Sequence, residues 1–147
     1  AWKFELLMKP EGNLITEGPV WDGEHIYFTH IHKSRILRYD PKQRYTEWRS
    51  ATNRTNGLAF DEQGRLFGCC AGGRAILRFD PDGRNVVIAD RVGGKKLNTP
   101  NDLAIDRKGR IWFTNPINEG NWDKTEVTEL DNRSVLRADP QKDGSYT

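Results

Sequence analysis

Short apolar runs separated by polar turns recur along the chain in an ordered pattern. Three long segments share this pattern, and they read EGPVWDGEHIYFTHI, NGLAFDEQGRLFGCC and NDLAIDRKGRIWFTN. Each begins with a polar residue, continues through a short apolar strand to an aspartate, turns, and enters a second strand. The segments start at Glu17, Asn56 and Asn101, 39 and 45 residues apart. The pattern therefore predicts a structural repeat of about 40 residues.

Each repeat continues into a third strand that ends in the same Arg-x-Asp-Pro turn. The three copies are RILRYDP (35–41), AILRFDP (75–81) and SVLRADP (134–140). The first two repeats add a fourth strand, RYTEWRS (44–50) and NVVIADR (85–91), whose β-branched and aromatic residues favour extended backbone. Four antiparallel strands about every 40 residues are typical of a β-propeller blade. We therefore predict an all-β fold, a propeller of four-stranded antiparallel blades with about three blades in the chain.

The repeat also predicts how the chain divides into a closing strand and three blades. Residues 1–12 form a closing strand, and blades one, two and three span residues 13–52, 53–92 and 93–147. Blade three lacks a clear outer strand, whereas WKFELLM (2–8) is a spare strand before blade one, and the polar segment 117–132 is expected to be a long loop. Because propellers have about four to eight blades, three blades cannot close a ring. We predict completion to six blades by a homodimer or by a second half-propeller chain, with a truncated product of a longer protein as the alternative.

Composition and charge narrow the class of protein. The chain has 23 Lys and Arg residues against 21 Asp and Glu residues, a net charge of +2, and the charges are interspersed, so no nucleic-acid partner is predicted. No apolar run approaches the roughly 18 residues of a membrane span, and the N-terminal residues do not resemble a signal peptide. We expect a cytoplasmic protein with no membrane partner. The adjacent Cys69 and Cys70 lack metal-ligand spacing and are expected to be small strand residues.

The repeated segments resemble the senescence marker protein (regucalcin), gluconolactonase and lactonase family of six-bladed propellers. The resemblance lies in EGPVWDGEHIYFTHIHKSRILRYDP, NGLAFDEQGRLFGC and NTPNDLAIDRKGRIWFTNP, and it matches only the N-terminal half of a full family member. It implies a divalent-metal-dependent lactone hydrolase, gluconolactonase-like, or a degenerate relative of one. The implied substrate is a small lactone or sugar-derived molecule, and the implied cofactor is a divalent cation, usually calcium, in the central channel.

Four residues near the starts of the innermost strands are candidate site residues. By resemblance, Glu17 matches the family's metal-binding glutamate, and Asn101 matches an asparagine at the substrate and metal site. Asn56 holds the equivalent position in the second repeat, and Thr99 stands where relatives often have arginine; both are expected to contact substrate. The innermost strands of a propeller line its channel, so Glu17, Asn56 and Asn101 should point toward one axial site. Their oxygen atoms suit a hard cation such as Ca²⁺ or Mg²⁺.

Three positions depart from the family pattern. His30, Cys70 and Asn115 end the second strands of their repeats, where relatives commonly have acidic residues. No catalytic residue is assigned: Asp102 is expected to be a hydrogen-bonding turn residue, and His30 a structural residue that could act as a base. Two interpretations stay open. One is hydrolysis of a lactone ester by metal-activated water, and the other is a non-catalytic propeller that binds a ligand or a protein at its channel face.

Overall fold

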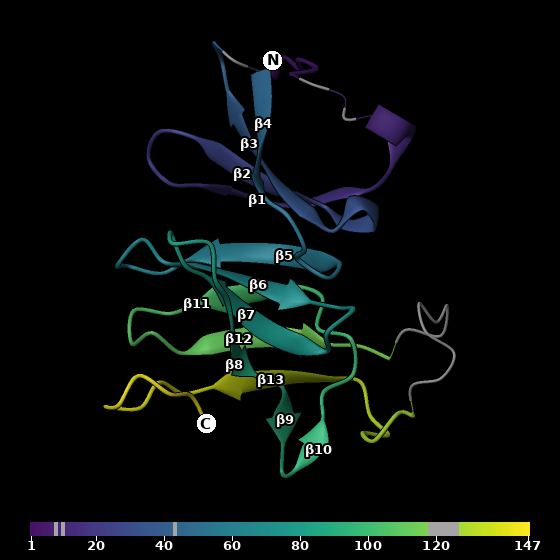
Figure 1. The fold of residues 1–147 in the computed structure, drawn as a ribbon, viewed down its shortest axis with the longest axis vertical. Coiled ribbons are helices and arrows are strands. Elements are labelled where there is room, and N and C mark those ends of the chain that lie inside the picture. Colours follow the sequence, from purple (N-terminus) through teal and green to yellow (C-terminus); the bar gives the residue numbers. More distant parts are fainter. Residues whose placement is uncertain (8, 10, 43, 118–126) are drawn as a thin grey trace.

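Three antiparallel sheets lie one beside another along the long axis of the molecule (Figure 1). The computed structural model describes residues 1–7, 9, 11–42, 44–117 and 127–147. The first sheet has the order β1 (Thr16–Trp21), β2 (Ile26–His30), β3 (Arg35–Asp40) and β4 (Arg44–Arg49). The second has the order β5 (Thr55–Phe60), β6 (Leu66–Cys70), β7 (Ala75–Phe79) and β8 (Asn85–Ala89). The third has the order β11 (Leu103–Ile105), β12 (Ile111–Asn115) and β13 (Ser134–Ala138).

These sheets are the predicted blades one, two and three, and all their strand pairs are antiparallel. A two-stranded hairpin of β9 (Arg91–Val92) and β10 (Lys95–Lys96) connects blades two and three. Two short 3-10 helices are present in the part of the chain that the structure describes. The helix η1 (Glu11–Asn13) precedes blade one, and η2 (Ile31–Lys33) lies between β2 and β3 of blade one. Neither they nor any other helix in the described residues has the length and apolar character needed to cross a membrane.

The turns between the first two strands of blades two and three follow the predicted chemistry. Asp61 accepts hydrogen bonds from the backbone N–H groups of Gln63 and Arg65 at 3.0 and 2.8 Å. Gly64 closes this turn with a φ of 73°, a left-handed conformation that glycine adopts without a Cβ clash. Gly109 has a φ of 74° in the corresponding turn of blade three. The Asp-x-x-Gly pattern therefore fixes the hairpins that bring each second strand back along the first.

The hydrophobic core is divided into two clusters, each between neighbouring blades. The cluster between blades one and two contains Tyr27, Ile36, Leu58, Leu66, Cys70, Ala75, Leu77 and Phe79. The cluster between blades two and three contains Phe67, Cys69, Ile76, Leu97, Leu103, Ile111, Phe113 and Ala138. Because side chains alternate along a strand, β6 contributes to both clusters and is buried along its whole length. Both cysteines are free and buried, so their interpretation as small strand residues is confirmed.

The outer faces of the first and third blades belong to neither cluster. Phe28 and Leu37 are 8% and 0% exposed on the outer face of blade one, and Leu7 from the N-terminal segment borders a pocket with Phe28 there. On the outer face of blade three, Trp112 and Val135 are 38% and 67% exposed. Blade two is therefore the only blade of the described structure with a neighbouring blade on each side.

The strand expected over residues 2–8 is not formed in this structure. Residues 1–7 contain no strand, and Trp2 and Phe4 are 95% and 93% exposed, because no strand of the described residues pairs with this segment. Met8 lies outside the described residues. The role of the segment as a closing strand for another blade stays a prediction.

Blade three has three strands, as the sequence predicted, and a short return of the chain beyond them. Asp139 and Thr147 exchange two backbone hydrogen bonds of 2.7 and 3.0 Å, and Pro140 forms a single bridge with Tyr146. The segment expected as a long loop connects β12 to β13, although its residues 118–126 lie outside the described part of the chain.

Candidate functional site

Glu17, Asn56 and Asn101 lie around one pocket. The innermost strands of the three blades are neighbours, since β1 contacts β5 and β5 contacts β11. A pocket of about 380 Å³ lies across them, and Glu17, Asn56, Thr99 and Asn101 all contribute to its lining. The structure therefore brings together the four residues that the sequence selected as a site.

A glycine after Glu17 lets blades one and two approach to backbone contact. Gly18 has a φ of 56°, which disfavours any residue with a Cβ. A Cβ built on Gly18 would lie 2.7 Å from the Leu58 nitrogen and 2.8 Å from the Asn56 carbonyl oxygen. The close approach holds Glu17 beside Asn56, and a β-bulge between Glu17 and Val20 accommodates it.

A glycine also permits backbone contact between blades two and three. The Gly57 N–H donates a hydrogen bond of 2.8 Å to the Asn101 carbonyl oxygen. A Cβ on Gly57 would lie 2.9 Å from that oxygen and 2.7 Å from the Asp102 Cα. The Asp102 carboxylate packs against Gly57 and accepts a hydrogen bond from the Leu103 N–H at 2.9 Å. Asp102 is thus a hydrogen-bonding turn residue, as the sequence indicated, and it is not part of the pocket lining.

The pocket side chains differ in how much of their hydrogen-bonding capacity is already used. The exposed Glu17 carboxylate accepts one hydrogen bond of 3.3 Å from the Gly18 N–H. Within the described part of the chain, the side-chain amides of Asn56 and Asn101 make no hydrogen bond. The Thr99 hydroxyl donates to a carbonyl oxygen, that of Pro116, at 2.7 Å. The carboxylate and two amides are therefore available to a ligand, whereas Thr99 offers only its acceptor lone pairs.

The pocket offers oxygen ligands, the type that a hard cation prefers, but only part of a full coordination shell. Carboxylate and amide oxygens are ligands that Ca²⁺ accepts, with about six to eight per ion. Glu17, Asn56 and Asn101 offer one carboxylate and two amide oxygens at equivalent positions. Among the described residues, no group of three or more His, Cys, Asp or Glu side chains lies close enough to hold a metal. A cation in this pocket would depend on amide and further oxygen ligands.

His30, Cys70 and Asn115 occupy equivalent positions and are not among the residues that line this pocket. They end β2, β6 and β12, and they are 0%, 1% and 0% exposed. Their side chains hydrogen-bond to neighbouring segments: His30 Nδ1 accepts from Arg35 Nε at 3.2 Å, Cys70 Sγ lies 3.2 Å from the Asn53 carbonyl oxygen, and Asn115 Oδ1 accepts from the Asn98 N–H at 3.0 Å. The three departures from the family pattern therefore lie in buried contacts between segments, outside the lining of this pocket.

Asn98 is a positioning residue that the sequence did not single out. Its side-chain amide donates to the carbonyl oxygens of Asn115 and Asn132 at 3.4 and 2.9 Å, and it is 4% exposed. These bonds hold the segment that carries Thr99 and Asn101 against blade three. A signal was present in the sequence, since Asn98 lies three residues before Asn101, just as Asn53 lies three residues before Asn56 in the second repeat.

We expect the stability of the protein to fall as the pH drops through the range below about 6.5, the ordinary pKa of histidine. Burial, followed by the charges of Arg35 and Lys33, lowers the pKa of His30. The unfolded chain then binds a proton at a pH where the folded chain does not, so the free energy of unfolding decreases as pH falls from about 6.5 toward the lowered pKa. Urea unfolding at several pH values between about 7.5 and 5.5 measures this slope.

The variant His30→Asn removes the titrating group, and its slope in this range should be smaller than that of the wild type. His32→Asn is the matched control, because His32 is an exposed neighbour in the same segment. An unchanged slope in His30→Asn would show that other groups produce the effect.

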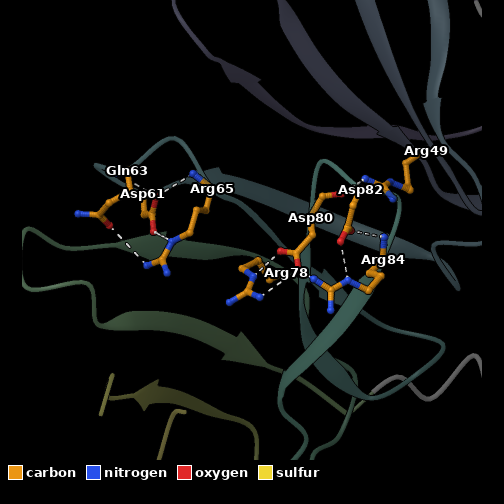
Figure 2. Close-up of polar contacts among 8 residues, drawn as sticks. All are labelled: Arg49, Asp61, Gln63, Arg65, Arg78, Asp80, Asp82 and Arg84. Atoms are coloured by element: carbon orange, nitrogen blue, oxygen red, sulfur yellow. Dashed lines mark hydrogen bonds and ion pairs between the residues drawn. The ribbon is translucent and has the colours of Figure 1, made fainter. Parts of the chain in front are cut away.

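At the end of blade two that lies opposite the pocket, carboxylates are paired with arginines (Figure 2). Each accepts a hydrogen bond from an arginine nearby in the chain: Asp61 from Arg65, Asp80 from Arg78, and Asp82 from Arg84. The hydrogen bond from Arg78 is the main cause that holds the pKa of Asp80 below its usual range. Arg49 of blade one also donates to the Asp80 carbonyl oxygen and so links blades one and two. These carboxylates stabilise turns, and they leave Glu17 as the carboxylate that lines the pocket.

The three neighbouring antiparallel sheets, two of four strands and one of three, and the pocket across their innermost strands define part of a β-propeller. Residues 15–145 match the family model described as the SMP-30/Gluconolactonase/LRE-like region. The chain therefore belongs to the SMP-30/gluconolactonase/LRE-like family, as its repeated motifs predicted.

Known proteins agree with this assignment. A gluconolactonase of Xanthomonas campestris is 38% identical, with a TM-score of 0.78, over 88% of this chain and 44% of that chain. A gluconolactonase of Zymomonas mobilis is 26% identical over 85% of this chain and 40% of its own length. Regucalcin of Agrobacterium tumefaciens, described as a calcium-binding protein, is 19% identical with a TM-score of 0.55 over 74% of this chain and 40% of that chain, a likeness of fold alone. The chain spans less than half the length of these relatives.

Proposed function

We propose that this chain contributes to the active site of a divalent-metal-dependent lactone hydrolase of gluconolactonase type. The observation that carries the proposal is the meeting of Glu17, Asn56 and Asn101 in one pocket at the channel face of three neighbouring blades. Similarity to two gluconolactonases supports the choice of a lactone as substrate.

Each pocket residue has a role that follows from its atoms. Glu17 and Asn101 would hold a divalent cation, for which calcium is the proposed identity because all the donors are oxygen atoms. A bound divalent cation polarises an ester carbonyl and stabilises the negative charge that develops on its oxygen. Asn56 has a free amide that can donate to the lactone carbonyl, and Thr99, whose hydroxyl already donates to Pro116, would contact the lactone without donating to it. The pocket therefore binds and orients the ester group.

A second candidate function is a non-catalytic propeller that binds a ligand or a protein at the same face. The observation in its favour is that the described pocket lining contains one carboxylate, Glu17. If Glu17 holds the cation, then this part of the chain offers no second carboxylate to accept a proton from water. Asp102 does not fill that role, since its side chain packs against Gly57.

Completion of the ring is part of the proposal. The apolar side chains of Trp21 on blade one and Trp112 on blade three are 59% and 38% exposed, and such surfaces favour a further blade on each side. We propose that a second copy of this chain, or a second half-propeller chain, covers them and supplies the remaining ligands and the base. A cytoplasmic location is also proposed, in keeping with the free thiols of Cys69 and Cys70.

The homodimer predicts a solution mass of twice 16.9 kDa, measured by light scattering on the purified chain. A folded monomer at all concentrations would contradict the homodimer, and it would leave a second half-propeller chain or the rest of a longer protein as the means of closing the ring.

The proposed activity is tested by a pH-indicator assay on several lactones with the purified chain. We expect hydrolysis above the spontaneous rate in the presence of calcium, and loss of that activity after chelation. Full activity in the chelated protein would exclude the metal-dependent mechanism. A folded protein that binds calcium and lactone without hydrolysis would favour the non-catalytic alternative.

A further inference from the structure

The lining of the pocket has a polar part and an apolar part. Glu17, Asn56 and Asn101 are polar, and Glu17 and Asn101 are exposed. The apolar part, called the collar, consists of Ile15, Ile31, Ala71, Pro116 and Ile117. All three blades contribute to this collar, so a molecule bound to the polar residues would contact apolar side chains from each blade.

The backbone register explains how blade one places its part of the collar. The β1–β2 ladder pairs Thr16 with His30, next to the position of Glu17. One step farther along, the Ile31 N–H donates to the Ile15 carbonyl oxygen at 3.3 Å. The ladder therefore continues beyond the polar position, and both residues of the added step carry large apolar side chains. Ile31 is 5% exposed, whereas Ile15 is 52% exposed.

Blades two and three repeat this extension. The Ala71 N–H donates to the Arg54 carbonyl oxygen at 3.3 Å, and the Thr99 N–H donates to the Pro116 carbonyl oxygen at 3.1 Å. The residue that follows the second strand is apolar in every blade. Because the Thr99 hydroxyl already donates a hydrogen bond to the Pro116 carbonyl oxygen, it provides no free donor to the pocket.

We propose that the pocket selects lactones with an alkyl or aryl substituent over polyhydroxylated sugar lactones. This inference rests on the proposed lactone hydrolase function. In that function Glu17, Asn56 and Asn101 serve the cation and the ester group, so the substituent of a bound lactone meets the collar. An alkyl chain loses contact with water there without leaving polar atoms unpaired, whereas hydroxyl groups in the same place would lose their hydrogen bonds to water.

Two lactones with the same ring size test the proposal: δ-decalactone, which carries a pentyl chain, and D-glucono-δ-lactone, which carries hydroxyl groups. The purified full chain with calcium should hydrolyse δ-decalactone with a kcat/KM at least about tenfold higher. A preference for D-glucono-δ-lactone would overturn the inference and leave the hydrolase function standing.

Variants of the collar connect the preference to its residues. Ile15→Gln and Ile117→Gln change two collar side chains that are not fully buried, and each should reduce the preference at least about tenfold. Val87→Gln is the matched control, because Val87 is 59% exposed on β8 and outside the pocket. An unchanged preference in both collar variants would also overturn the inference.

A binding measurement keeps the inference testable if the chain hydrolyses neither lactone, a result that would count against the proposed function. The corresponding lactams keep the substituents, and their amide bonds resist hydrolysis. We expect the pentyl lactam to shift the methyl resonances of Ile15 and Ile117 at lower concentration than the polyhydroxylated lactam. Equal or reversed affinities would contradict the proposed selectivity.

Discussion

Replacing Gly57 with alanine is expected to lower the free energy of unfolding by about 3 kcal/mol, at the upper end of the range for overpacked sites. The added methyl group would lie 2.7 Å from the Asp102 Cα and 2.9 Å from the Asn101 carbonyl oxygen, so the obstacle is backbone that cannot rotate away. Relief of the clash requires blades two and three to move apart. That movement would also break the 2.8 Å hydrogen bond between Gly57 and Asn101. Chemical denaturation measures the loss of stability.

Gly64→Ala is the control for this variant. Gly64 lies in a turn with a φ of 73°, and a Cβ there would meet no atom within 4 Å. Its replacement should cost about 1–2 kcal/mol for the left-handed backbone alone, with no effect on the pocket. If Gly57→Ala costs no more than Gly64→Ala, the innermost strands of blades two and three do not approach as closely as described.

Replacing Glu17 with glutamine is expected to reduce kcat/KM for lactone hydrolysis by about 100-fold or more, since loss of even indirect metal partners costs about 10–100-fold. The variant keeps the size of the side chain and removes the negative charge that would hold the cation. Stability should change little, because the Glu17 side chain is exposed and makes one long hydrogen bond to its neighbour Gly18. Steady-state kinetics at saturating calcium, with a denaturation curve of the same sample, separate the two effects.

Glu24→Gln is the matched control for Glu17→Gln. Glu24 lies in the turn after β1 with its side chain 84% exposed, and it is outside the pocket lining. The Glu24→Gln variant should retain the wild-type kcat/KM for lactone hydrolysis. Equal losses in the two variants would indicate a general effect of surface charge, and full activity of Glu17→Gln would remove Glu17 from the site.

The repeat in the sequence was enough to predict the blades, their strand order and the grouping of Glu17, Asn56 and Asn101. The reason is geometric, because residues at equivalent positions of neighbouring blades must lie side by side when the blades stack. The glycines after Glu17 and Asn56 did not need to be interpreted for this prediction, although they permit the backbone contacts that make it true.

Other features depend on contacts that no local pattern contains. The segment 2–8 alternates like a strand, yet it needs a partner strand that the described residues do not provide. His30 and Asn115 stand where relatives commonly have acidic residues, but their hydrogen bonds come from Arg35, which is paired with His30 across the β2–β3 ladder, and from Asn98 in the segment before β11. The apolar collar was also missed, because its residues stand just outside the repeated motifs that defined the candidate site.

The most direct test of the central claim, that one pocket across three blades holds a cation, is a crystal structure of the chain grown with calcium. The account predicts a calcium ion in contact with the Glu17 carboxylate and the side-chain oxygen of Asn101, and no ion at that place in Glu17→Gln crystals. A structure in which the calcium ions contact neither residue, or in which the pocket holds no ion at saturating calcium, would contradict it.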